Sequence, residues 1–229
     1  MLAVANATCM GHLHRHAANQ KTAEVSKFGY SGAVGPLLWQ TLTEENSACE
    51  KGENRSPINI DSSIQKAICA PKIHIPQIER AEFENLGTTI EVIVNGTTEF
   101  ANKTFSLKQF HFHSPSEHCI DEEFFPLEMH MVHQFADGNF IVLGLLFDVS
   151  QLSTPLIDDL AKKVSKISEP GSITAAGPLD MAAIIKHFET TPLRQYSGSL
   201  TTPPCREGIT FLIAEQPLPI NPSSFNSIR

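Results

Sequence analysis

Five of the ten histidines of this 229-residue chain fall in one stretch, between Gln109 and Gln134. His111 and His113 are separated by a single residue. Side chains on a β-strand alternate between the two faces of the sheet, so both imidazoles would point the same way. His130 lies in a second strand-like run, residues 127–133. Two neighbouring strands could therefore present three imidazoles to one point.

Three neutral imidazole nitrogens leave the fourth position of a tetrahedral zinc open, which is typical of a catalytic site. The same residues are also compatible with another fold, because His111-x-His113-x-x-x-Glu117 fits the first metal motif of a cupin jelly roll, with Glu117 as a ligand. A cupin usually has a glycine several residues before the first histidine and a Pro-x-Gly turn before the last. Phe105 precedes His111 and no Pro-x-Gly leads to His130, so a cupin-like metalloprotein is the weaker interpretation.

Several separated segments resemble the α-class carbonic anhydrases of the secreted type. They are QFHFHSPSEH at 109–118, LEMHMVHQ at 127–134, YSGSLTTPPC at 196–205, RSPINI at 55–60 and FGY at 28–30. The resemblance runs from about Phe28 to the end of the chain. It implies a single domain, 28–229, that is mainly β, with a twisted, mostly antiparallel central sheet and small surface helices. Residues 1–27 are interpreted as an irregular leader, and MLAVANA at 1–7 as the remnant of a signal peptide.

The resemblance implies that His111, His113 and His130 bind Zn²⁺ and that the activity is the reversible hydration of carbon dioxide to bicarbonate and a proton. In this family zinc lowers the pKa of its bound water to about 7, and the resulting hydroxide attacks carbon dioxide. Gln109 and Glu128 match family residues that hold the far nitrogens of two ligands. Each lies two residues before a ligand and therefore on the same strand face.

By the same resemblance, Glu117 and Thr201 form a gate. An ionised Glu117 accepts a hydrogen bond from the Thr201 hydroxyl, so the Thr201 oxygen must accept a hydrogen bond from the attacking group and thereby orients it. The resemblance also implies a substrate pocket formed by Val132, Val142, Leu200, Thr202, Ile209 and Phe211. Phe211 stands where the family usually has Trp. Thr88 stands where fast members have a proton-shuttling His, so proton export should limit turnover.

The resemblance to secreted relatives implies a disulfide between Cys49 and Cys205, which would tether the gate loop. Five cysteines are an odd number, and no pairing is predicted for Cys9, Cys69 and Cys119. The chain stops at Arg229, before the closing Asn-Trp-Arg-Pro segment of the family. We therefore expect it to be less stable, and to bind zinc less well, than a version extended through that segment.

The composition narrows the set of partners. A net charge of −8 argues against nucleic acid and anionic membranes, and no apolar stretch is long enough to predict a transmembrane helix. Sequons at Asn6, Asn95 and Asn102 favour a secreted glycoprotein. The resemblance implies small-molecule partners, namely carbon dioxide and bicarbonate, with sulfonamides and small anions as inhibitors. The oligomeric state does not follow from the sequence.

Periodicity predicts the local elements. Strands are expected over residues 89–94, 140–147 and 208–215, and helices over 155–167 and 181–188. Ser153 is the expected N-cap of the first helix, and Trp39 an expected core residue. His133 faces away from the three candidate ligands and is interpreted as a buried structural histidine. His12, His14 and His16 are interpreted as part of a solvated tail.

Some relatives in the resembling family are non-catalytic binding modules, and these typically lack a ligand histidine. All three candidate ligands are present here, together with Glu117 and Thr201. The complete set favours an enzyme, a carbonate dehydratase, over a binding module.

Overall fold

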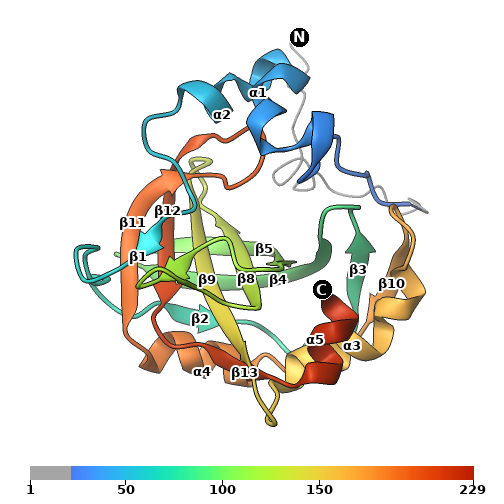
Figure 1. The fold of residues 1–229 in the computed structure, drawn as a ribbon. Helices are drawn as coiled ribbons and strands as arrows, with labels where there is room; N and C mark the ends of the chain where they lie inside the picture. Colours follow the sequence, from blue (N-terminus) through green and yellow to red (C-terminus); the bar gives the residue numbers. More distant parts are fainter. Residues whose placement is uncertain (1–21) are drawn as a thin grey trace.

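The computed structural model describes residues 22–229, and its centre is one curved β-sheet (Figure 1). The strand order is β10-β3-β4-β5-β8-β9-β12-β11, with β2 beside β4 and β13 beside β9. Most neighbours are antiparallel, but β9 pairs in parallel with β12 and with β13. The predicted mainly β, single-domain fold is confirmed, and its sheet is mixed.

The strands of this sheet are β2 (Lys72–His74), β3 (Ala81–Asn85), β4 (Ile90–Phe100), β5 (Lys103–His113), β8 (Leu127–Gln134), β9 (Phe140–Val149), β10 (Ile173–Ala176), β11 (Leu193–Ser199), β12 (Glu207–Ala214) and β13 (Leu218–Ile220). A small second sheet contains β1 (Asn59–Ile60), β6 (Cys119–Ile120) and β7 (Glu123–Phe124). The strands predicted over 89–94, 140–147 and 208–215 correspond to β4, β9 and β12.

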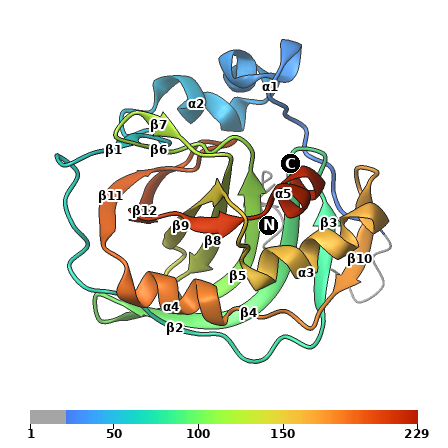
Figure 2. The same ribbon diagram turned by 60° about the horizontal axis from the view of Figure 1, so that its bottom comes forward.

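Short helices surround the sheet. They are η2 (Gly32–Val34), η3 (Pro36–Leu38), α1 (Trp39–Leu42), η4 (Glu44–Ser47), α2 (Ala48–Lys51), α3 (Pro155–Val164), η5 (Ser165–Ile167), α4 (Ala182–Thr190) and α5 (Pro222–Ile228). Figure 1 shows α1 and α2 at one end of the molecule and α4 at the other, and Figure 2 shows α3 and α4 from a second direction.

The two faces of the sheet differ in polarity. One face contributes Phe83, Phe110 and Met131 to the main core, where they join apolar residues of α3 and α4 such as Leu160 and Phe188. Alternation along the strands therefore turns the intervening residues, including the candidate histidines, to the other face. The apolar stripes of α3 and α4 pack against this core face, and this packing holds in place the strands that carry the site.

The start and the end of the helix predicted over residues 155–167 differ from the prediction. The N-cap residue of α3 is Thr154 and not Ser153, and the Ser153 hydroxyl donates a hydrogen bond to Asp158 at 2.7 Å. The helix ends at Val164, and the buried Ile167 belongs to the 3₁₀ helix η5 that follows. The second predicted helix is confirmed as α4.

His133 and Trp39 are core residues, as predicted. His133 is fully buried, with Nε2 2.9 Å from the Thr98 hydroxyl and Nδ1 3.0 Å from the Met131 carbonyl oxygen. Trp39 packs with Phe28 and with a disulfide-bonded cysteine pair. Both side chains therefore act in packing and not in the candidate metal site.

The other sequence predictions concern the surface and the leader. Asn95 and Asn102 are exposed, on β4 and in the β4–β5 turn. Cys69 and Cys119 are free thiols. Residues 1–21, which include Asn6, Cys9 and the histidines at 12, 14 and 16, lie outside the described residues. In residues 22–229 no helix is long and apolar enough to cross a membrane.

Candidate metal centre

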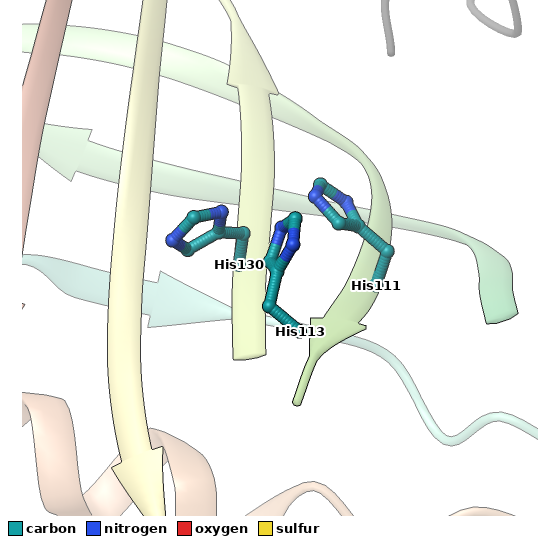
Figure 3. Close-up of side chains that lie close together, drawn as sticks. All are labelled: His111, His113 and His130. Atoms are coloured by element: carbon teal, nitrogen blue, oxygen red, sulfur yellow. The ribbon is translucent and has the colours of Figure 1, made fainter. Parts of the chain in front are cut away.

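Two antiparallel strands bring the three histidines together. His111 on β5 is directly opposite His130 on β8, and His113 follows two residues later on the same face of β5. Their exposed fractions are 3%, 7% and 2% for His111, His113 and His130 respectively. Figure 3 shows the three rings gathered in front of the two strands. One nitrogen from each lies within 4.8 Å of the others, a spacing suited to one metal ion.

Hydrogen bonds fix which ring nitrogens face inward. His111 Nδ1–H donates to Gln109 Oε1 at 2.8 Å, so Nε2 is the nitrogen turned away from Gln109. His130 Nε2–H donates to Glu128 Oε1 at 2.7 Å, so its Nδ1 is the nitrogen that can hold a metal. His113 Nε2 is buried without a hydrogen-bond partner. A buried, partnerless acceptor is costly unless something binds it, and a cation would satisfy it.

The electrostatics agree with metal ligation. Burial holds the pKa of His111 and of His113 well below the usual range, and the neighbouring histidines lower it further. Both rings are therefore neutral at physiological pH, as ligation requires. Burial also lowers the pKa of His130, but the charge and hydrogen bond of Glu128 outweigh this, and the net shift is upward. Metal binding at this ring would therefore compete with its protonation.

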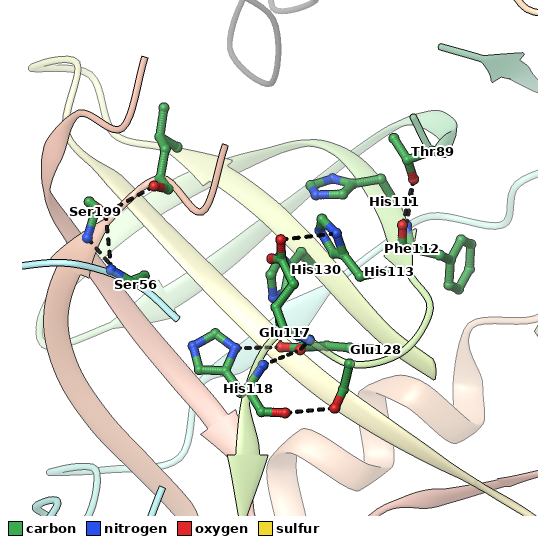
Figure 4. Close-up of polar contacts among 12 residues, drawn as sticks. Ser56, Thr89, His111, Phe112, His113, Glu117, His118, Glu128, His130 and Ser199 are labelled. Carbon is green, nitrogen blue, oxygen red and sulfur yellow. Dashed lines mark hydrogen bonds and ion pairs between the residues drawn. The ribbon is translucent and has the colours of Figure 1, made fainter. Parts of the chain in front are cut away.

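Glu128 is fully buried and holds the site together from behind (Figure 4). Its Oε1 accepts from His130 and, at 2.7 Å, from His118 Nδ1–H. Its Oε2 accepts the backbone N–H groups of Glu117 and His118 at 2.8 and 2.9 Å. Burial alone would raise the pKa of Glu128, but the two imidazoles lower it well below its usual range. The carboxylate is therefore ionised.

His118 and Tyr196 extend this network, and neither was predicted from the sequence. The Tyr196 hydroxyl lies 2.6 Å from His118 Nε2 and 2.8 Å from the Ser56 hydroxyl. The chain Ser56–Tyr196–His118–Glu128 connects three distant segments to one candidate ligand. No local spacing signals it, because the partners are separated by 140, 78 and 10 positions in the sequence.

Glu117 lies against two of the three histidines. Its Oε1 is 3.3 Å from His113 Nδ1, and its Oε2 is 3.9 Å from His130 Nδ1. Burial raises the pKa of Glu117, and this outweighs the charge of His130 and a hydrogen bond with Thr201, which lower it. Glu117 and Thr201 therefore lie together, and the contact of Glu117 with His113 is one that was not predicted from the sequence.

An apolar cavity opens beside the histidines. It is lined by His111, His130, Val132, Val142, Leu200, Thr201, Thr202 and Phe211. Ile209, predicted as a pocket residue, does not line this cavity and packs in the cluster that forms its wall. Phe211 stacks on Tyr196, with ring centroids 4.9 Å apart and the rings 9° from parallel. Such a cavity suits a small apolar molecule, with polar groups only at its histidine and threonine end.

Residues 34–229 match the family model described as eukaryotic-type carbonic anhydrase. The chain belongs to this family. A carbonic anhydrase of Pectobacterium atrosepticum is 36% identical over 203 residues, which cover 87% of this chain and 80% of that protein. Dioscorin DB3L of Dioscorea polystachya is 35% identical over 188 residues, 80% of this chain and 68% of that one.

Solved structures agree with this assignment. The α carbonic anhydrase of Aspergillus oryzae superposes with a TM-score of 0.85 and 40% identity, covering 89% of this chain and 88% of that one. The α-carbonic anhydrase of Thermovibrio ammonificans, in complex with the inhibitor sulfanilamide, superposes with a TM-score of 0.79 and 35% identity, covering 88% and 89%. The fold of this carbonic anhydrase chain is thus that of the α class.

Two features singled out in the sequence complete the description of this carbonic anhydrase site. Cys49 and Cys205 form the disulfide that the resemblance implied, and it links α2 to the loop that carries Thr201. Thr88 is half-buried, and its hydroxyl lies 2.8 Å from that of Ser26. A threonine does not titrate near neutral pH, so this position offers no proton carrier.

Proposed function

We propose that this chain catalyses the reversible hydration of carbon dioxide to bicarbonate and a proton, with Zn²⁺ held by His111, His113 and His130. One observation carries the proposal. Three buried imidazoles converge, two of them line an apolar cavity, and the third, His113, has a partnerless Nε2. Membership of the carbonic anhydrase family supports the activity, and the histidine set supports the metal.

The donor set fits zinc. Three imidazole nitrogens without a cysteine or carboxylate ligand correspond to a catalytic site with an open position. Zinc bound there would supply a Lewis acid and a nucleophile available at neutral pH. Gln109 and Glu128 would keep His111 and His130 in the tautomers that direct a lone pair at the ion.

The remaining residues would bind and orient. Val132, Val142, Leu200 and Phe211 offer carbon dioxide a dry wall, which favours an uncharged, apolar substrate over water. An ionised Glu117 can only accept, so it would accept a hydrogen bond from the Thr201 hydroxyl and leave the Thr201 oxygen as an acceptor facing the cavity. That acceptor would orient the attacking group towards the substrate.

The test measures zinc content and carbon dioxide hydration on one purified sample. We expect one zinc per chain, hydration activity, and inhibition by primary sulfonamides, the inhibitor class seen on the Thermovibrio relative. His113→Ala should lose most of the zinc and activity, whereas His74→Ala, at an exposed histidine on β2, should keep both. Full zinc occupancy in His113→Ala would refute the ligand assignment.

A binding module is the second candidate, and the dioscorin relative is the observation that favours it. A binding module would require neither zinc nor turnover. A zinc-loaded sample without hydration activity would support this alternative, while activity that disappears with the zinc and returns on its addition would exclude it.

We also propose that the chain follows a secretory route. The disulfide between Cys49 and Cys205 supports this, because such bonds persist in oxidising compartments. Asn95 and Asn102 are exposed and accessible to glycosylation. Mass spectrometry of protein secreted from a eukaryotic host should find glycan on at least one of them, and unmodified asparagines at both positions would contradict the glycoprotein assignment.

A further inference from the structure

A second cavity lies beside the gate residues, with a volume of about 280 Å³. We call it the gate cavity. It is lined by Tyr30, Pro36, Trp39, Cys49, Arg55, Ser56, Pro57, Glu117, Ser199, Leu200, Thr201 and Cys205. Leu200 and Thr201 also line the cavity next to the histidines. These two residues therefore separate the gate cavity from the substrate cavity, and anything bound in one contacts a wall of the other.

Most of the gate cavity is apolar. Its walls carry two aromatic rings, two prolines, Leu200 and the disulfide. The two serines in the wall, Ser56 and Ser199, already form hydrogen bonds with each other and with neighbouring residues. Each backbone N–H donates to the hydroxyl of the other serine, Ser199 Oγ–H donates to the Leu200 carbonyl, and Ser56 Oγ bonds the Tyr196 hydroxyl. Serine recognition of a ligand is therefore not available without breaking these bonds.

Arg55 is the one basic residue among the lining side chains. It is exposed, its Nε–H donates to the Gly52 carbonyl, and within residues 22–229 no carboxylate pairs with it. A guanidinium presents several donors in a planar fork that matches a carboxylate. An arginine without an ion-pair partner at the edge of an apolar cavity is complementary to a molecule with one anionic end and an apolar body.

We propose that the gate cavity binds a small aromatic carboxylate, with the carboxylate on Arg55 and the ring among Trp39, Pro57 and Leu200. The volume lies at the lower limit of cavities that hold drug-sized ligands, about 300–1,000 Å³, so a single ring fits best. A cationic ligand would be repelled by Arg55 at the exposed edge, and the anionic end of a ligand has to lie at that edge because Glu117, the other charged lining residue, is largely buried. A neutral apolar ligand would leave the guanidinium without its partner.

The functional consequence rests on the proposed hydration activity. A ring packed against Leu200 and Thr201 displaces Thr201, the residue that Glu117 is expected to orient. Occupancy of the gate cavity therefore lowers the hydration rate, while the open coordination position at the metal remains accessible. Inhibition is therefore not competitive with a sulfonamide. This distinguishes the gate cavity from direct binding of a carboxylate to the metal.

Benzoate is the probe, and calorimetric titration of the zinc-loaded protein is the first measurement. Arg55→Ala should weaken binding about tenfold or more, the usual contribution of a hydrogen bond to a charged group. Arg55→Lys should recover part of the loss. Lys51→Ala removes a nearby positive charge on α2 that does not line the cavity, so it should bind benzoate as the parent does. Absence of binding, or equal binding by Arg55→Ala, would overturn the proposal.

The second measurement separates the two cavities. Benzoate should still bind, and its binding should still depend on Arg55, in protein saturated with sulfanilamide and in protein stripped of metal by a chelator. Loss of benzoate binding in either sample would place it at the metal and overturn the proposal. Arg55-dependent binding in a protein that shows no hydration activity would leave the gate cavity standing and reject the proposed function instead.

Discussion

Glu128→Gln should disturb the metal centre most strongly among substitutions that leave the three histidines intact. The carboxylate accepts four hydrogen bonds, two from imidazoles and two from backbone N–H groups. A glutamine has one accepting oxygen and one donating nitrogen in their place. Whichever way the amide is turned, two of the four donors lose their acceptor and face an N–H instead.

The expected loss of stability follows from these two lost hydrogen bonds. Hydrogen bonds to charged groups contribute about 1.5–3 kcal/mol each, and breaking a buried charged pair costs about 3–5 kcal/mol. We therefore expect Glu128→Gln to lose about 3–5 kcal/mol of unfolding free energy, or about 6–20 °C in Tm for a domain of this size. Zinc affinity should fall about 10–100-fold, because His130 loses the partner that fixes its tautomer.

Glu91→Gln is the matched control. Glu91 is as buried as Glu128 and lies on β4, which β5 separates from β8, but neither of its carboxylate oxygens has a hydrogen-bond partner. Burial and the nearby Glu84 raise the pKa of Glu91 well above its usual range. The folded state therefore keeps this group protonated while the unfolded state ionises it. Keeping the carboxyl group protonated in the folded state costs free energy once the pH exceeds the unfolded pKa of about 4.3. Glutamine does not ionise, so Glu91→Gln should become more stable than the parent as the pH rises above that value.

Thermal unfolding between pH 4 and pH 8 and a competitive zinc-chelator titration test both variants. Because the pKa of Glu128 is depressed in the folded state, its contribution is complete above its unfolded pKa of about 4.3 and is lost only as the pH falls through the folded value. The deficit of Glu128→Gln should therefore be full at pH 7. Unchanged Tm and zinc affinity in this variant would refute the reasoning, as would an equal loss in Glu91→Gln.

Three further predictions concern single features. Thr88→His should raise turnover in dilute buffer with little change in kcat/KM, because histidine can carry the released proton out of the cavity and threonine cannot. Turnover that responds neither to buffer concentration nor to the substitution would count against this prediction. Replacing Cys49 and Cys205 together by Ser should cost on the order of 5 kcal/mol, since the bridge spans 156 positions, and an unchanged denaturation midpoint would disagree. His133 has a pKa lowered by burial to about 4, so its unfolded form gains a proton first as the pH drops below about 6.5, and this group should remove about 3 kcal/mol of stability by pH 4. In His133→Gln the fall of stability over that pH range should be shallower by this amount.

The contents of the candidate site could largely be read from local sequence. Strand alternation placed His111, His113 and Gln109 on one face of β5, and Glu128 and His130 on one face of β8. These relations depend only on a two-residue period, which any regular strand imposes on its neighbours. The same reasoning assigned His133 to the opposite face, where it is buried. The partner of Cys205 came instead from resemblance, because spacing alone cannot choose among five cysteines.

The long-range contacts were decided only by the tertiary structure. His118 lies in a loop where no periodicity applies, so its bonds to Glu128 and Tyr196 could not be anticipated. The parallel pairing of β9 with β12, which brings Val142 beside Phe211, likewise depends on how distant segments cross. The N-cap of α3, one residue later than predicted, is by contrast a local difference at a helix boundary. Local pattern fixes the direction of a side chain, whereas its partners depend on strand order and packing between segments far apart in the chain.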